Sequence, residues 1–301
     1  MDYVLSSPMK GGSLPMLPAH DTCTVYHGTN LFAARIIRKI GIRLDVQREL
    51  TDFGKGFYVT LNPQQAKNWA QIRAMHPQIS PDLLAQLNMS QSQYFNHPEI
   101  KIPACLVYEL NVSQLRQLNG KEFSLPHEPG WERHQRSWER FVLDCRTGKR
   151  HHYDYVYGPV AKGHLTNIEK IKVSRTKDQL SLNSMRAVKC LSTLDIVAFK
   201  PEDIYMKTFL LKQLWNHIQN SENARNYRFL HEIRNELMMI GNLTSRQADK
   251  MLRQSLTSLP FSSIIMHEPA AYWAFSVLYG MRKLWYKEYE VYMKKKHGAR
   301  K

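Results

Sequence analysis

The stretch Asp52-Phe53-Gly54-Lys55-Gly56-Phe57-Tyr58-Val59-Thr60 decides how the chain is interpreted. Its closely spaced glycines predict a turn, and the aromatic and β-branched residues that follow predict a strand over 57–61. An alternating segment over 22–27 predicts an earlier strand, which contains His27. After the quoted stretch, an Asn-Pro pair at 62–63 marks the start of a helix that carries Trp69.

Taken singly, these residues have ordinary explanations. His27 fits a core histidine, and Gly54 with its neighbouring glycine fits a plain turn. Tyr58 and Trp69 fit a packed aromatic pair. Their occurrence together and in this order favours a binding site over packing alone.

The remaining pattern divides the chain into three parts. Strands are expected over 105–112, 153–160 and 178–183, and helices over 81–88, from Ser137, and from Ser184 with Leu191 facing inward; residues 113–134 are expected to form a loop. Every strong segment after residue 200 is helical, over 202–219, 225–240, 244–256 and 269–296. We therefore expect a loose arm over 1–20, an α+β domain over 21–199 and an all-α domain over 200–301.

Composition predicts a folded and strongly basic protein. The 301 residues are 43% hydrophobic, which is typical of globular chains and argues against general disorder. The net charge of +16 favours nucleic acid as a partner, with an acidic protein or an anionic membrane surface as the next candidates. Basicity without any such partner is the competing interpretation.

The cysteines argue against a metal centre. Cys23, Cys105, Cys145 and Cys190 are scattered and form no Cys-x-x-Cys pair, so neither a zinc site nor a disulfide framework is expected. Reduced thiols indicate the cytoplasm. No signal peptide is recognisable, and the longest apolar run, over 270–281, is too short to cross a bilayer.

Several motifs together resemble those of ADP-ribosyltransferases of the diphtheria-toxin and poly(ADP-ribose) polymerase type. Val25–Thr29 is similar to the family's His-Gly-Ser/Thr motif and Phe53–Tyr58 to its Gly-Lys-Gly-Ile-Tyr motif, with Trp69 at the spacing of its second aromatic. A little-characterised bacterial branch of the fold is more similar still. It shares the motifs Gln65–Ala70, Trp138–Phe141 with Arg146, and Tyr153–Ala161, so the resemblance covers about residues 23–195.

The resemblance implies a fold of split antiparallel β-sheets with flanking helices, and NAD+ as co-substrate. The catalytic residues would be His27, Tyr58 and Gln179, and the residues that bind NAD+ would be Gly28, Thr29, Gly54, Trp69 and Arg146. The nicotinamide ring would stack between Tyr58 and Trp69, and the backbone of Gly28 would hold its carboxamide. His27 and Thr29 would bind the adenosine-side ribose. Arg146 would bind the pyrophosphate, with a surface salt bridge as the equal alternative.

Gln179 departs from the family, which has glutamate at this position. An amide can hold a ribose hydroxyl but carries no charge and cannot act as a base. We therefore expect transfer of a single ADP-ribose to a macromolecule. The alternatives are a protein-targeting transferase, an NAD glycohydrolase, and a non-catalytic module that binds NAD or nucleic acid.

Nucleic acid is the expected acceptor. Basic residues are dense over 133–152 and 282–301, and the second stretch interleaves lysines with Trp285, Tyr286, Tyr289 and Tyr292, a pattern that suits single-stranded nucleic acid. A solvated helix whose aromatics face the core is the competing interpretation. A basic cytoplasmic enzyme of this kind fits the toxin of a toxin–antitoxin or phage-defence system, with an antitoxin or inhibitor protein as a further partner.

Overall fold

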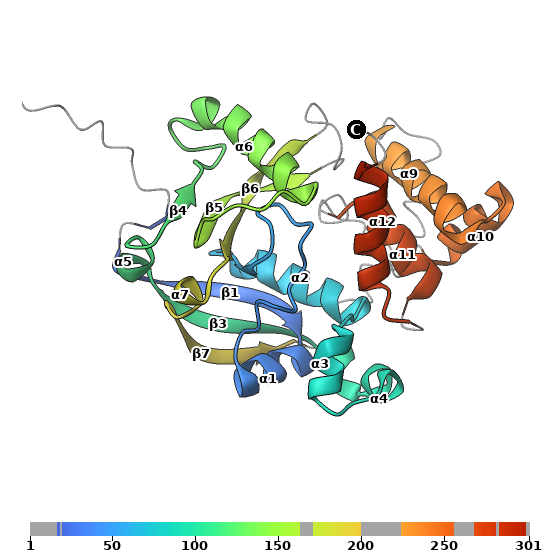
Figure 1. The fold of residues 1–301 in the computed structure, drawn as a ribbon, viewed down its shortest axis with the longest axis horizontal. Coiled ribbons are helices and arrows are strands. Elements are labelled where there is room, and N and C mark those ends of the chain that lie inside the picture. The colour runs from blue at the N-terminus through green and yellow to red at the C-terminus, as the bar shows by residue number, and fades with distance from the viewer. Residues whose placement is uncertain are drawn as a thin grey trace, which may run out of the picture.

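The computed structural model describes residues 17–18, 20–162, 171–199, 224–255, 268–280 and 283–298 (Figure 1). Nearly all of the expected arm over 1–20 and the whole expected helix over 202–219 lie outside these residues. The described part is a mixed α/β structure with two sheets, followed by a helical C-terminal region.

The first 200 residues contain all of the strands that the structure describes. In order they are β1 (Thr22–Asn30), α1 (Leu31–Ile40), β2 (Phe57–Val59), α2 (Pro63–Met75), α3 (Pro81–Gln86), α4 (Gln91–Asn96), the 3₁₀ helix η1 (Pro98–Lys101), β3 (Pro103–Asn111), α5 (Val112–Leu115), β4 (Gly120–Glu122), α6 (Trp131–Arg146), β5 (Tyr155–Lys162), β6 (Lys172–Leu182), α7 (Met185–Val188) and β7 (Leu191–Ala198). The C-terminal region contains α9 (Ala224–Gly241), α10 (Ser245–Ser255), α11 (Ala270–Tyr279) and α12 (Tyr286–Gly298).

The strands form one sheet of three and one of four. The first has the order β1-β3-β7 and is antiparallel throughout. The second has the order β2-β6-β5-β4, in which only the pair β4–β5 is parallel. The two sheets meet at a single bridge between Tyr26 of β1 and Thr60, just after β2.

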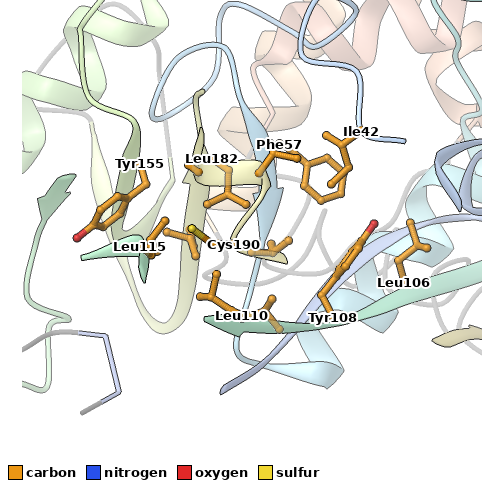
Figure 2. Packing of buried hydrophobic residues seen from close by; sticks show 14 of the residues in the cluster. Ile42, Phe57, Leu106, Tyr108, Leu110, Leu115, Tyr155, Leu182 and Cys190 are labelled. Carbon is orange, nitrogen blue, oxygen red and sulfur yellow. The ribbon is translucent and has the colours of Figure 1, made fainter. Parts of the chain in front are cut away.

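Alternation along the strands builds the layers of the fold. On each strand, every second side chain points into the space between the two sheets. This space is filled by Phe57, Tyr108, Leu110 and Leu182, among others (Figure 2). Trp138 and Val142 of α6 pack on the outer face of the second sheet. Helix α2 covers the outer face of the first sheet (Figure 1), so the strand edges where the sheets meet lie between α2 and the second sheet.

Helix α2 approaches β1 so closely that only glycine fits at position 28. A Cβ on Gly28 would lie 2.0 Å from the carbonyl oxygen of Ala66 and 2.8 Å from the backbone nitrogen of Ala70. Since both atoms belong to a helix backbone, neither can move aside alone. The position of α2, and of the Trp69 side chain that it carries, therefore depends on this glycine.

The C-terminal helices pack on the α/β part through a shared core. Trp273 of α11 and Trp285 and Tyr289 at α12 are fully buried in a cluster that also contains Leu50 and Ile72. Of the two interpretations of the 282–301 stretch, a helix whose aromatics face the core is confirmed at Trp285 and Tyr289.

Several local expectations are also corrected. The helix expected from Ser184 ends at Val188, and Leu191 begins β7 instead of continuing that helix. The expected loop over 113–134 contains β4 and the start of α6, which begins before Ser137. The expected helix over 269–296 is interrupted, since α11 ends at Gly280 and α12 begins at Tyr286.

Within the described ranges, no helix combines the length and the apolar character needed to cross a membrane.

A Gly28→Ala substitution tests the close packing of β1 on α2. The added methyl would overlap the carbonyl of Ala66, so we expect the free energy of unfolding to fall by about 1–3 kcal/mol. The measurement is denaturant unfolding, with Thr24→Ala as a control on an exposed position of the same strand. Equal stabilities of the two variants would contradict the packing described.

Candidate active site

The site begins where β1 and β2 part. Tyr26 and Thr60 exchange two backbone hydrogen bonds of 2.9 and 3.0 Å. Hydrogen bonding alternates along an antiparallel strand, so Gly28, like Tyr26, directs its N–H and C=O away from β3. Because the strands have already separated there, these two groups of Gly28 have no hydrogen-bond partner among the described residues.

His27 holds the separated strands in place. Its Nδ1 donates to the backbone oxygen of Tyr58 at 2.7 Å, and its ring stacks on Phe57 with centroids 4.3 Å apart. Burial lowers the pKa of His27 from 6.5 to about 4, so the ring is neutral at pH 7. With the proton on Nδ1, the Nε2 atom is a hydrogen-bond acceptor.

A cavity of about 510 Å³ occupies the gap between the strand edges. It is lined by every residue expected at the site except Gly54, namely His27, Gly28, Thr29, Tyr58, Trp69, Arg146 and Gln179. His27 and Thr29 project from the same face of β1, while Trp69 reaches the cavity from α2. The fold thus brings together residues that are as far apart in the chain as Gly28 and Gln179.

Tyr58 is fixed at both its backbone and its hydroxyl. The hydroxyl donates to the carbonyl oxygen of Gly54 at 2.8 Å, accepts from the backbone N–H of Phe53 at 2.9 Å and lies 2.7 Å from the hydroxyl of Thr51. Burial raises the pKa of Tyr58, so the phenol stays protonated. Its ring therefore has a set orientation beside the cavity.

Gly54 contributes to the turn and not to the cavity wall. It has a φ of 72°, a left-handed conformation that glycine adopts without a Cβ penalty. Its carbonyl accepts the hydrogen bond from Tyr58. The expectation that Gly54 lies directly at the cofactor is replaced by an indirect role, in which it shapes the turn that holds Tyr58.

Arg146 is buried and already paired. Its side chain is 2% exposed, and both its Nε and its Nη2 lie 2.7 Å from Oδ1 of Asp52. Nη2 also donates to the carbonyl oxygen of Ala161 at 3.3 Å. The structure therefore favours the ion-pair interpretation of Arg146 over the pyrophosphate role, although the pair is buried and does not lie on the surface.

Asp52 is the site residue that the sequence did not reveal as functional. Besides Arg146, it accepts hydrogen bonds at Oδ2 from the backbone N–H of Ala161 and from Nε2 of Gln179, both at 2.8 Å. Asp52 also lines the cavity. The sequence feature that could have pointed to Asp52 was its position at the start of the Gly-rich stretch, directly before Phe53.

Gln179 and Asp178 face opposite sides of β6, as expected for adjacent strand residues. Gln179 lies on the same face as Tyr58 of the neighbouring β2. Asp178 instead accepts hydrogen bonds from the hydroxyl of Thr60 at 2.8 Å and the backbone N–H of Leu61 at 2.9 Å. Asp178 therefore stabilises the chain at Thr60 and Leu61, next to the bridge, and it does not line the cavity.

The C-terminal region supplies the opposite wall of the cavity. Glu268, Pro269, Tyr286, Lys287 and Glu290 line it. Arg48 donates to both carboxylate oxygens of Glu268, at 2.6 and 2.9 Å, and its guanidinium lies 4.6 Å from the ring centre of Tyr286. The C-terminal region therefore packs on the α/β part.

Arg73 links the two walls. It lies 5.4 Å from the ring centre of Trp69 and donates to the hydroxyl of Tyr272 at 3.0 Å. Its nearest carboxylate contact is Glu268, at 3.8 Å, and Glu268 is shared with Arg48. Arg48 and Arg73 together carry two positive charges, and Glu268 neutralises only one of them.

Basic residues of the 282–301 stretch are largely engaged within the protein. Four of its lysines form ion pairs, namely Lys283 with Glu288, Lys287 with Asp82, Lys294 with Glu49 and Lys296 with Glu236. Together with the buried aromatics, these pairs remove the basis for a nucleic-acid stacking surface on α12. Over the ranges that the structure describes, no group of three or more potential metal ligands gathers.

Comparison with known proteins places the chain in a family. A family model described as "Protein of unknown function (DUF3990)" matches residues 23–193, more than half of the 301 residues. The chain belongs to the DUF3990 family. The match includes β1, β2 and β6 with all of the expected site residues, and it ends before the C-terminal helices of this DUF3990 protein. A search of curated proteins found no match.

The lowered pKa of His27 predicts a stability that depends on pH. Between pH 6.5 and about 4 the unfolded chain binds a proton at this residue and the folded chain does not. Stability therefore falls as the pH is lowered through this window, by on the order of 2 kcal/mol. Urea unfolding at several pH values measures it, and a His27→Gln variant should lack this part of the dependence. If the free energies of unfolding of wild type and His27→Gln differed by the same amount at every pH, a neutral buried His27 ring would be refuted.

The ion pair of Arg48 with Glu268 should stabilise the packing of the C-terminal region. Glu268→Gln leaves a mostly buried guanidinium without its carboxylate, and we expect a loss of about 3 kcal/mol. The pair of Lys287 with Asp82 joins the same two parts of the chain but is exposed, so Lys287→Gln should cost less than about 1 kcal/mol. Thermal unfolding of Glu268→Gln and Lys287→Gln measures both losses of stability. Losses of similar size would contradict the larger contribution of the buried ion pair.

Proposed function

We propose that this protein is a mono-ADP-ribosyltransferase that uses NAD+ and modifies a macromolecule. The observation that carries the proposal is the unpaired backbone of Gly28, which opens into a cavity bordered by Tyr58 and Trp69. A carboxamide offers one donor and one acceptor group, and the free N–H and C=O of Gly28 match them. The flat apolar ring attached to that carboxamide suits a slot with aromatic side chains on its walls.

The neighbouring residues fit the two riboses of NAD+. Nε2 of His27 can accept from a ribose hydroxyl, and Thr29 projects from the same face of β1. Gln179 lines the cavity near Tyr58 and can accept from a second hydroxyl. With both ends of NAD+ held, the bond between nicotinamide and ribose breaks, and its electron pair passes to nicotinamide. The cationic ribose carbon is then captured by the acceptor, whose proton passes to solvent.

Arg73 is the better candidate than Arg146 for the pyrophosphate. It lies one helical turn after Trp69 on α2 and lines the cavity. Its positive charge is close enough to contribute to the lowered pKa of His27. The phosphates of a bound dinucleotide would therefore lie between Trp69, proposed to hold the nicotinamide, and His27, proposed to hold the adenosine-side ribose.

Nucleic acid remains the proposed acceptor, on the net charge of +16. The surface that supports it is α6 and not α12, because Arg133, Arg136 and Arg140 are exposed at helical spacing along one face of α6. A role as the toxin of a toxin–antitoxin or phage-defence system, with a neutralising partner, is part of the same proposal.

Trp69→Ala should strongly reduce the release of nicotinamide from NAD+. Loss of one stacking surface removes binding in the ground state and in the transition state, so we expect kcat/KM to fall by about 10²-fold. Trp69→Phe keeps a ring and should retain most activity, and Tyr153→Ala, outside the cavity, serves as the control. Release of nicotinamide is followed chromatographically. Full activity of Trp69→Ala would exclude this pocket as the nicotinamide site.

The acceptor is identified with NAD+ labelled in the adenosine part, incubated with RNA, DNA or total cell lysate. Label on nucleic acid supports the proposal, and a triple Arg133→Gln, Arg136→Gln, Arg140→Gln variant should then label less while nicotinamide release is unchanged. Label on protein alone would refute nucleic acid as acceptor, and free ADP-ribose alone would identify a glycohydrolase.

A further inference from the structure

The orientation of the Gln179 amide is fixed by its neighbours. Nε2 donates to Oδ2 of Asp52 at 2.8 Å and to the carbonyl oxygen of Pro159 at 3.3 Å. Both partners are acceptors, because both oxygens of Asp52 already accept from Arg146 and the Ala161 N–H, and a carbonyl cannot donate. The amide nitrogen must therefore point at them. Gln179 Oε1 has no protein donor in the described part of the chain, and the residue borders the cavity.

Asp52 explains why an amide and not a carboxylate stands at position 179. Its carboxylate already accepts from Arg146, from the N–H of Ala161 and from Gln179, and it is 8% exposed. A second carboxylate at 2.8 Å would face it with like charge and no donor between them. The carboxylate that contacts position 179 therefore belongs to the turn before β2.

We propose that Asp52 is a positioning residue for the transfer reaction. It fixes the Gln179 amide with its oxygen toward the cavity, and it places a carboxylate beside that amide from the turn before β2. This inference rests on the proposed function, since a ribose hydroxyl is the group that Gln179 would hold. The uncharged amide then orients the sugar, while the nearby carboxylate stabilises positive charge that develops on the ribose as nicotinamide leaves.

The charged and titratable groups around position 179 are few. Asp52 faces it from the turn and Arg146 from α6, and Tyr58 lies on the adjacent strand of the same sheet face. Asp178 is turned to the other face of β6. A carboxylate placed at position 179 would therefore share a proton with Asp52, so its pKa would be raised.

A swap of the two side chains separates positioning from a structural role. Gln179→Glu should lower kcat for nicotinamide release by about tenfold at pH 7 with little change in KM, and activity should recover as the pH falls and the pair takes up a proton. The double variant Asp52→Asn/Gln179→Glu keeps one carboxylate and one amide, and should recover most of the wild-type kcat and pH profile. A double variant no more active than Asp52→Asn alone would overturn the proposal.

A readout that does not need turnover separates this inference from the proposed function. In Gln179→Glu, the free energy of unfolding relative to wild type should fall as the pH rises from about 4 to 7, because the folded protein resists ionisation of the second carboxyl. The double variant should lack this fall. If the wild type releases no nicotinamide with any acceptor but these unfolding curves hold, the transferase proposal fails and the amide orientation stands. A Gln179→Glu variant with no such pH dependence would overturn the role of Asp52.

Discussion

The site depends on the point at which β1 and β2 part. Among the described residues, the two edges pair only at the antiparallel bridge of Tyr26 with Thr60. Beyond it, the His27 ring takes the backbone oxygen of Tyr58 that a neighbouring strand would otherwise bond, and the edges separate. A side chain thus replaces one ladder bond, and the backbone of Gly28 is left facing a cavity. Buried backbone groups are almost always paired, so an opening of this kind favours a polar ligand or water at that position.

Two separate sets of contacts keep the opening in shape. On one side, the turn over 51–54 holds the hydroxyl of Tyr58, and Asp52 in that turn binds Arg146 and Gln179. On the other, the close approach of β1 to α2 at Gly28 fixes Trp69. The turn holds Tyr58 through local contacts, whereas the contacts of Asp52 and of Gly28 join segments distant in sequence.

The C-terminal helices form part of the cavity wall. They contribute Glu268 and Tyr286 to its wall and pack Trp285 and Tyr289 against Leu50 and neighbouring residues. The family match ends at residue 193, so this wall comes from a part of the chain outside the matched segment. Arg48, Arg73 and Glu268 place charged groups at the cavity beside this wall.

The sequence allowed a good part of the site to be predicted, because its residues occur in short motifs. The Gly-rich turn, the strand with Tyr58 and the helix with Trp69 are encoded locally and appear where expected. The roles of Gly54, Arg146 and Asp52 could not be predicted, since each depends on a contact made only in the folded chain. Strand β7 was missed because Leu191 continues an apolar spacing that also suits a helix, and pairing with β3 decides between them.

The most direct test of the account is a crystal structure of the protein with nicotinamide bound. The account predicts the carboxamide on the N–H and C=O of Gly28, with the ring between Tyr58 and Trp69. Nicotinamide bound elsewhere, or a Gly28 edge that stays unoccupied at saturating ligand, would contradict it.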